Sequence, residues 1–428
     1  MPYVTYASNG YAFKVDDHQF ILSATIPPFI FTIDTRNTSI GSSASNQFTL
    51  PTLSGGVYGA EVQWGDGETS VITAYNSAYV THTYSTPGTY NVQIDGVFHG
   101  FRFNNSGDKL KILNIFNWGL NFRLCSATSA QGNYFQGCAN LTITAADKLD
   151  LTSVTSLYSA FNGCTSLATA PTMALWDTSN VVNMNSVFTN CSIFNQPIGA
   201  WNTSSVINMG SMFSGCSSFN QPLNSWNTAK VTTFSTMFYN CTVFNQPLSN
   251  WNTSLSSAFD NMFSYARAFN QDISGWNVSR GGNFSYMFRN AISFNQPIGA
   301  WTTTNMNNTT IMFQGATAFN QDLGNWNMSK VTSTAYMFQG ATAFKKNLGA
   351  WSPLALTNAI NMFYGIDIND TGTTTNYDAL LTGWAAKAIL SNVQFSGGNS
   401  KYSSMGKAAR EYLTGAKLWT ISDGGLAA

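Results

Sequence analysis

The stretch FNQPIGAWNTSSV at residues 194–206 recurs as FNQPLNSWNTAKV at 219–231 and as FNQPLSNWNTSLS at 244–256. The same 25-residue spacing separates eight of the twelve tryptophans, from Trp176 to Trp351. One such unit is too short to bury its own aromatic side chains, whereas stacked units share a continuous core. The repeat therefore predicts a solenoid. We expect a buried column, termed the tryptophan spine, formed by Trp201, Trp226, Trp251, Trp276, Trp301 and Trp326.

Cysteine occupies another repeated column, at Cys191, Cys216 and Cys241. Later repeats place alanine at this position, in the column Ala266, Ala291, Ala316 and Ala341. Because alanine substitutes for cysteine, the position needs a small buried group, and we expect structural thiols instead of disulfides. The chain has no CxxC or Cys/His spacing typical of a zinc site. We expect neither a metal nor a cofactor.

An Asn-Gln pair recurs in the same register, from Asn195–Gln196 to Asn320–Gln321. Two interpretations remain open. The amides form ladders that satisfy one another and the nearby backbone, or they present a row of identical donors to a repeating ligand. We favour the ladder, and under the second interpretation the ligand-binding residues are Asn220, Gln221, Asn245, Gln246, Asn270 and Gln271.

Charged residues make up only 9% of the chain, with 19 basic and 19 acidic side chains. This balance provides no basic face for a phosphate backbone, so we expect no nucleic-acid partner. A polar, uncharged surface instead suits neutral ligands such as glycans. The most apolar stretch, FILSATIPPFIFTI at 20–33, is interrupted by Pro27 and Pro28 and is shorter than a membrane span, so we expect no membrane insertion. The opening MPYVTYASNG lacks the basic start of a secretion signal, and we expect no export signal.

Catalytic motifs are missing from the sequence. The three histidines, His18, His82 and His99, all lie outside the repeats. Asp272 and Asp322 occupy a position that other repeats fill with proline, which argues against a glycosidase carboxylate pair. There is no G-x-S-x-G, phosphate loop or Cys/His dyad. We therefore predict a non-enzymatic protein without catalytic residues.

The segment VINMGSMFSGCSSFNQPLNSWNTAKV at 206–231 resembles the repeat of BspA-like leucine-rich-repeat surface proteins. This resemblance implies a leucine-rich-repeat-like solenoid at 151–365, preceded by a transition and N-terminal solenoid coils at 106–150. NYDALLTGWAAKA at 376–388 resembles the module that ends such proteins. It implies a small α/β C-terminal cap at 366–428.

Ahead of the repeats, short alternating runs are separated by Gly, Pro, Asn and Asp, a pattern typical of a β-sandwich. The WGDG turn at 64–67 and HTYSTPGTY at 82–90 resemble the PKD-type immunoglobulin-like domain. The resemblance implies a sandwich at 31–105, with Asp66 forming a turn and His82 packed on a strand. We thus predict a mainly β chain, with an N-terminal β-sandwich, a leucine-rich-repeat-like solenoid and a small α/β cap.

Both resemblances imply an adhesive surface protein. Low charge and polar repeats favour a virus or phage fibre or spike at the virion surface, which binds a host glycan or protein receptor through the solenoid. The alternatives are a bacterial cell-surface adhesin of the BspA-like type, which is extracellular, and a capsid-decorating spacer without a ligand. Residues 1–30 are rich in aromatic side chains. We expect them to be an anchoring or assembly segment that binds other virion or surface-assembly chains, in a homo-oligomer.

Overall fold

The computed structural model describes residues 5–6, 12–16, 19–23 and 26–427. The protein is mainly β, as predicted, with two α-helices among the described residues. It divides into two compact units. The first comprises the chain up to Val154 together with Thr169–Trp176, and the second comprises Thr155–Ala168 and the chain from Asp177 onward.

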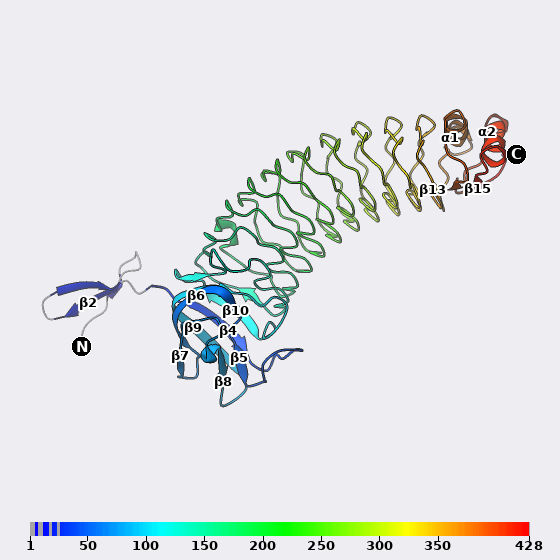
Figure 1. Cartoon of the computed structure of the whole chain (residues 1–428). Coiled ribbons are helices and arrows are strands. Elements are labelled where there is room, and N and C mark those ends of the chain that lie inside the picture. The colour runs from blue at the N-terminus through cyan, green and yellow to red at the C-terminus, as the bar shows by residue number, and fades with distance from the viewer. Residues whose placement is uncertain (1–4, 7–11, 17–18, 24–25, 428) are drawn as a thin grey trace. The chain divides into compact units, whose positions relative to one another are not determined.

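The first unit contains a seven-stranded sheet in the order β12-β10-β4-β9-β6-β7, with β11 paired to β9 (Figure 1). Its strands are β4 (Phe29–Asp34), β6 (Thr52–Gln63), β7 (Thr69–Ile72), β9 (Thr89–Phe101), β10 (Ile112–Asn117), β11 (Phe122–Arg123) and β12 (Thr142–Ile143). Two smaller sheets consist of β5 (Gln47–Thr49) with β8 (Thr81–Thr83), and of β1 (Thr5–Tyr6), β2 (Ala12–Asp16) and β3 (Gln19–Ser23). Short 3₁₀ turns are η1 (Ala78–Val80) and η2 (Met173–Leu175). Strands from the predicted transition at 106–150 therefore belong to the same sheet as strands from 31–105.

Strand β4 lies at the centre of the core of the first unit. Because successive side chains of a strand point to opposite faces, Phe29, Phe31 and Ile33 are buried together. The rings of Phe29 and Phe122 are 3.7 Å apart, and the ring of Phe31 lies 5.9 Å from that of Phe48 on β5. Side chains of the two sheets thus share one aromatic core. The anchoring segment predicted at 1–30 overlaps β4 at Phe29 and Ile30, and much of it lies outside the described residues.

The WGDG turn follows β6 and is held by its own side chains. Gly65 has a φ of 88°, and a Cβ there would lie 2.5 Å from the carbonyl oxygen of Asn91, so only glycine fits. Asp66 accepts a hydrogen bond from the backbone N–H of Glu68 and lies 2.7 Å from Nε2 of His82. The His82 ring stacks on Trp64 with a centroid distance of 4.8 Å. Asp66 of the turn and His82 on β8 therefore both have structural partners.

In the second unit, coils of 25 residues stack upon one another (Figure 1). Each coil contributes one parallel bridge residue, in the series Asn183, Asn208, Thr233, Ala258, Asn283, Asn308, Ser333 and Asn358. Backbone hydrogen bonds also connect the coils: Phe213 donates to Met237 at 3.0 Å. Most of each coil consists of turns, because a coil closes within 25 residues and leaves little room for straight strand. Residues 181–365 are called the repeat stack.

Helices α1 (Thr375–Ala385) and α2 (Ser404–Gly415) follow the repeat stack. The bridge series continues into a parallel sheet of β13 (Asn358–Ala359), β14 (Gln394–Ser396) and β15 (Thr420–Ser422). On α1, Trp384 stacks on Trp351 at 6.5 Å, and its Nε1 donates to the carbonyl of Leu348 at 3.0 Å. The helices therefore extend the aromatic core of the last coil.

Candidate functional site

The tryptophan spine is buried, with each of its six indoles only 2–4% exposed. From Trp226 to Trp326, the indole Nε1 donates to a backbone carbonyl 28 residues earlier, at 3.0–3.2 Å. Neighbouring rings lie parallel: Trp251 and Trp276 have centroids 6.3 Å apart and planes within 2°. Both the ring faces and the polar edge of each indole are thus used inside the protein.

The Asn-Gln pairs form a hydrogen-bonded ladder along the repeat stack. Oδ1 of Asn220 accepts from the backbone N–H of Asn245 at 2.9 Å and from Nε2 of Gln246 at 3.2 Å. Oδ1 of Asn245 accepts in the same way from Asn270 and Gln271, at 2.9 and 3.0 Å. Because these atoms connect adjacent coils, only the remaining amide atoms of the proposed ligand-binding residues are left for another molecule.

All six cysteines are buried, and none of them forms a disulfide in the described part of the chain. The thiols of Cys191, Cys216 and Cys241 donate to backbone carbonyls of the preceding coil at 2.9–3.0 Å. Burial raises the pKa of Cys191 to about 12 and also raises the pKa of Cys216 well above its usual range. Since the thiolate is the reactive form, these cysteines are poor nucleophiles.

Tyrosine interrupts the repeat pattern in a way that the sequence analysis missed. The repeat stack contains five tyrosines, and none of them is buried: Tyr239, Tyr265, Tyr286, Tyr336 and Tyr364. Each lies within two residues of the buried phenylalanine column that runs from Phe188 to Phe363. All five therefore belong to the same short segment of their coils, at positions that most other repeats fill with Ser, Thr, Asn, Gln or Gly; Arg289 and Ile311, the latter with a φ of 62°, are the exceptions.

Three of these tyrosines have backbone conformations that tyrosine rarely adopts. Tyr265, Tyr286 and Tyr336 have φ values of 61°, 61° and 57°. A residue other than glycine in this left-handed region costs about 1–3 kcal/mol, and asparagine tolerates it best. Asparagine does occupy the equivalent positions elsewhere, as at Asn240 and Asn261. Stability alone therefore does not explain the tyrosines.

Arg289 connects these rings. Its Cζ lies 5.1 Å from the ring centroid of Tyr265 and 5.7 Å from that of Tyr286, within the range of cation–π attraction. Tyr265 also meets Tyr239 edge to face, at 5.8 Å. Nε of Arg289 donates to Oε1 of Gln314 at 3.0 Å, and Nε2 of Gln314 donates to Gln339. We call this group the tyrosine–arginine cluster: Tyr239, Tyr265, Tyr286, Arg289, Gln314 and Gln339.

Four overlapping stretches of the chain, 130–242, 155–276, 222–317 and 258–377, match a family described as "Mycoplasma protein of unknown function, DUF285". Together they cover residues 130–377, more than half of the 428 residues. The chain belongs to this family. The DUF285 matches span the whole tyrosine–arginine cluster, and the description of the family states no function. No curated protein and no solved structure matches the chain.

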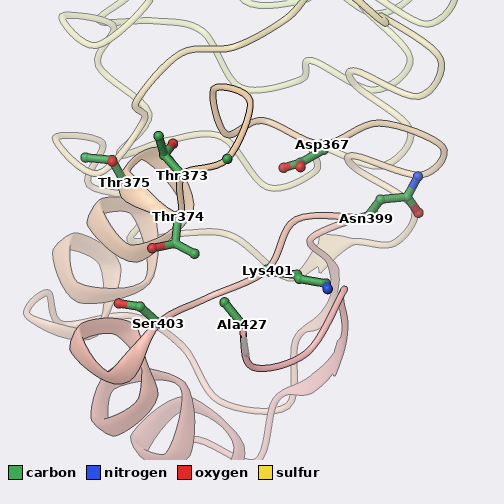
Figure 2. Close-up of a pocket in the computed structure, with 9 residues that line it drawn as sticks. Asp367, Thr373, Thr374, Thr375, Asn399, Lys401, Ser403 and Ala427 are labelled. Carbon is green, nitrogen blue, oxygen red and sulfur yellow. The ribbon is translucent and has the colours of Figure 1, made fainter.

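A polar cleft of about 610 Å³ lies near the C-terminal helices. Its lining residues run from Asp367 to Ala427, whereas the DUF285 matches end at residue 377. Figure 2 shows Thr373, Thr374 and Thr375 on one side of it and Asp367 and Asn399 on the other. The hydroxyls of Thr374 and Ser403 both donate to Oδ2 of Asp378 at 2.7 Å. Asp378 lies on α1, so the bond from Ser403, which precedes α2, connects the two helices, whereas the bond from Thr374 stays at the start of α1. At least two residues that line the cleft, Thr374 and Ser403, therefore have structural partners.

A second network joins α2 to the end of the chain. Asp423 accepts from Nε of Arg410 at 2.7 Å and from the hydroxyl of Tyr377 at 2.8 Å.

Among the described residues, no group of three or more His, Cys, Asp or Glu is placed to hold a metal ion. In the same part of the chain, neither helix has the length and apolar character needed to cross a membrane.

Proposed function

We propose that this DUF285 chain is a non-catalytic surface protein that binds a glycan through the tyrosine–arginine cluster. The observation that carries the proposal is the contrast between the buried columns of the repeat stack and the positions of its tyrosines. The buried Phe and Trp columns repeat faithfully, whereas the tyrosines of the repeat stack replace mostly polar residues, and only at half-exposed or exposed positions of one segment. Tyrosine combines an apolar ring with a hydroxyl, which suits a sugar that has an apolar face and a polar edge.

The proposal includes a finer description of the fold. The 25-residue bridge series and the faithful Phe and Trp columns support a leucine-rich-repeat-like solenoid of the BspA type. The aromatic contact between β4 and β5 supports a PKD-like sandwich in the first unit. In this description α1, α2 and β15 cap the solenoid, as the capping repeats of other solenoids do.

The location that we propose first is the surface of a virion, where the chain serves as a fibre or spike component. The low charge and polar repeats support it. A bacterial cell-surface adhesin of the BspA-like type is the alternative. A capsid-decorating spacer would need no tyrosine–arginine cluster, so glycan binding separates it from the other two.

Binding is tested with the full chain on a glycan array. We expect at least one glycan to bind, and its affinity to change by less than about tenfold between about 0.05 and 0.5 M NaCl, because few charges take part. The double variant Tyr265→Asn/Tyr286→Asn is expected to lower the affinity at least about tenfold, the effect of losing about 1.4 kcal/mol of stacking.

The double variant has a built-in control for folding. Asparagine occupies both equivalent positions in other repeats, as at Asn240 and Asn261, and tolerates the left-handed conformation. We therefore expect its melting temperature to equal or exceed that of the parent chain. Glycan binding that is unchanged in the variant, or absent from the parent chain, would refute the proposed function.

Assembly through the N-terminal segment is a separate part of the proposal. Because Phe29 lies in the core, the truncation that tests it removes residues 1–25 and leaves β4 intact. We expect the shortened chain to melt like the full one but to lose the homo-oligomer, as measured by light scattering. An unchanged mass would show that the segment does not mediate assembly.

A further inference from the structure

We propose that the tyrosine–arginine cluster binds a carboxylate-bearing sugar residue, and that Arg289 is the residue that recognises the carboxylate. This inference rests on the proposed function, because it names the class of glycan that the same surface takes. The ligand is a sparsely charged acidic polysaccharide, with uronic or sialic acid residues among neutral sugars.

Most N–H groups of the Arg289 guanidinium have no hydrogen-bond acceptor among the described residues. A guanidinium has five N–H donors in a planar fork. Only Nε has a hydrogen-bond acceptor among the described residues, Oε1 of Gln314 at 3.0 Å. The four N–H groups on the two Nη atoms have no such acceptor within the described part of the chain. Two parallel N–H groups of such a fork match the two oxygens of a carboxylate.

The surrounding side chains fix the orientation of that fork. The rings of Tyr265 and Tyr286 contact the guanidinium at 5.1 and 5.7 Å. Gln314 is a positioning residue, because its Nε2 donates to Gln339 while its Oε1 accepts from Arg289. A guanidinium held in this way loses less side-chain freedom when a ligand binds. The guanidinium is therefore preorganised to bind an anion. A mobile surface arginine would lack these partners.

Charge favours an acidic ligand at this place. From three residues before to four residues after each phenylalanine of the column, the acidic side chains are Asp260 and the more distant Asp367, and Oδ2 of Asp260 already accepts from the hydroxyl of Ser235 at 2.7 Å. Arg267, four residues after Phe263, is exposed and adds a second positive charge to that of the half-buried Arg289. Two cations are too few for a densely charged polyanion such as a nucleic acid, which limits the ligand to sparse carboxylates beside sugar rings that can pack on tyrosine.

Paired oligosaccharides test the proposal. Each probe contains one glucuronic or sialic acid residue, and its partner is the same oligosaccharide with the carboxyl group reduced to an alcohol. We expect the full chain to bind the acidic form at least about tenfold more tightly, the usual effect of a charge-assisted hydrogen-bond pair. Arg289→Gln should abolish this difference, and Arg289→Lys, which keeps the charge but loses the fork, should retain only part of it.

The chain offers matched controls for these variants. Glutamine occupies the position of Arg289 in the next two coils, as Gln314 and Gln339, so Arg289→Gln should fold normally. Arg280→Gln makes the same change of charge at an exposed position outside the cluster. It should leave the preference for the carboxylate unchanged.

The outcomes separate the two proposals. Equal binding of the acidic and reduced forms would overturn the carboxylate site and leave the proposed function in place, whereas failure to bind any glycan would overturn both. An equal loss of preference in Arg280→Gln and Arg289→Gln would also overturn the site, because it would reveal a general charge effect. A polyglutamate peptide that binds as tightly as the acidic oligosaccharide would overturn the assignment to a sugar.

Discussion

Replacing Trp251 by alanine is expected to lower the free energy of unfolding by about 3–5 kcal/mol, the usual range for an aromatic core truncation. The indole stacks between Trp226 and Trp276, at 6.5 and 6.3 Å, and lies 5.3 Å from the ring of Phe234. Its Nε1 also donates to the carbonyl of Leu223 at 3.0 Å. The variant would therefore lose contacts with both neighbouring coils and one of the two hydrogen bonds that the carbonyl of Leu223 accepts, the other coming from the backbone N–H of Trp226.

Denaturant unfolding, followed beside Asn307→Ala, measures this loss. Asn307 is exposed, and its substitution should change the stability by less than about 0.5 kcal/mol. Because each coil contacts only its neighbours, a defect in the middle of the stack should also weaken the coupling between the two halves. If Trp251→Ala cost less than about 1 kcal/mol, the tryptophan spine would not be the stabilising core of the repeat stack.

The 25-residue spacing of Phe and Trp predicted buried positions of the second unit. In stacked coils, equivalent residues occupy equivalent places in the core. Each core residue contacts its own equivalents, as Phe213 stacks on Phe238 at 5.7 Å, so burial follows directly from period. The 25-residue period does not reveal the tyrosine–arginine cluster. Its members differ from coil to coil, and only an alignment of all coils shows that every tyrosine of the stack falls in one segment.

The strand order of the first unit was harder to predict from the sequence, because its paired strands lie far apart in the chain. β4 pairs with β10, joining Phe31 to Ile115, and the sheet continues into β12. Local alternation identifies strands but does not say which distant strand pairs with which. The contacts of Asp108 and Lys111 were missed for the same reason, since their partners lie near residue 43, far away in the sequence.

Asp108 and Lys111 form a buried ion pair whose disruption is the second large effect that we expect. Their side chains are 0% exposed, and Nζ of Lys111 lies 3.2 Å from Oδ1 of Asp108. Nζ also donates to the carbonyls of Ser43, Ala44 and Gln47 at 2.8–3.0 Å. Burial lowers the pKa of Lys111, and the Asp108 carboxylate opposes that shift.

Asp108→Ala should therefore destabilise the first unit by about 3–5 kcal/mol, because it leaves a buried ammonium without its counter-charge. It would also remove the acceptor for the backbone N–H groups of Ser43 and Thr49, which now bond to Asp108 at 2.8 and 2.6 Å. Arg36→Ala is the matched control in the same unit, since the side chain of Arg36, which pairs with Asp34, is 61% exposed, and removing the exposed partner of such a pair costs about 0–1 kcal/mol. Thermal unfolding of both variants gives the comparison. Equal losses would mean that the carbonyls around Lys111 hold its charge without help from Asp108.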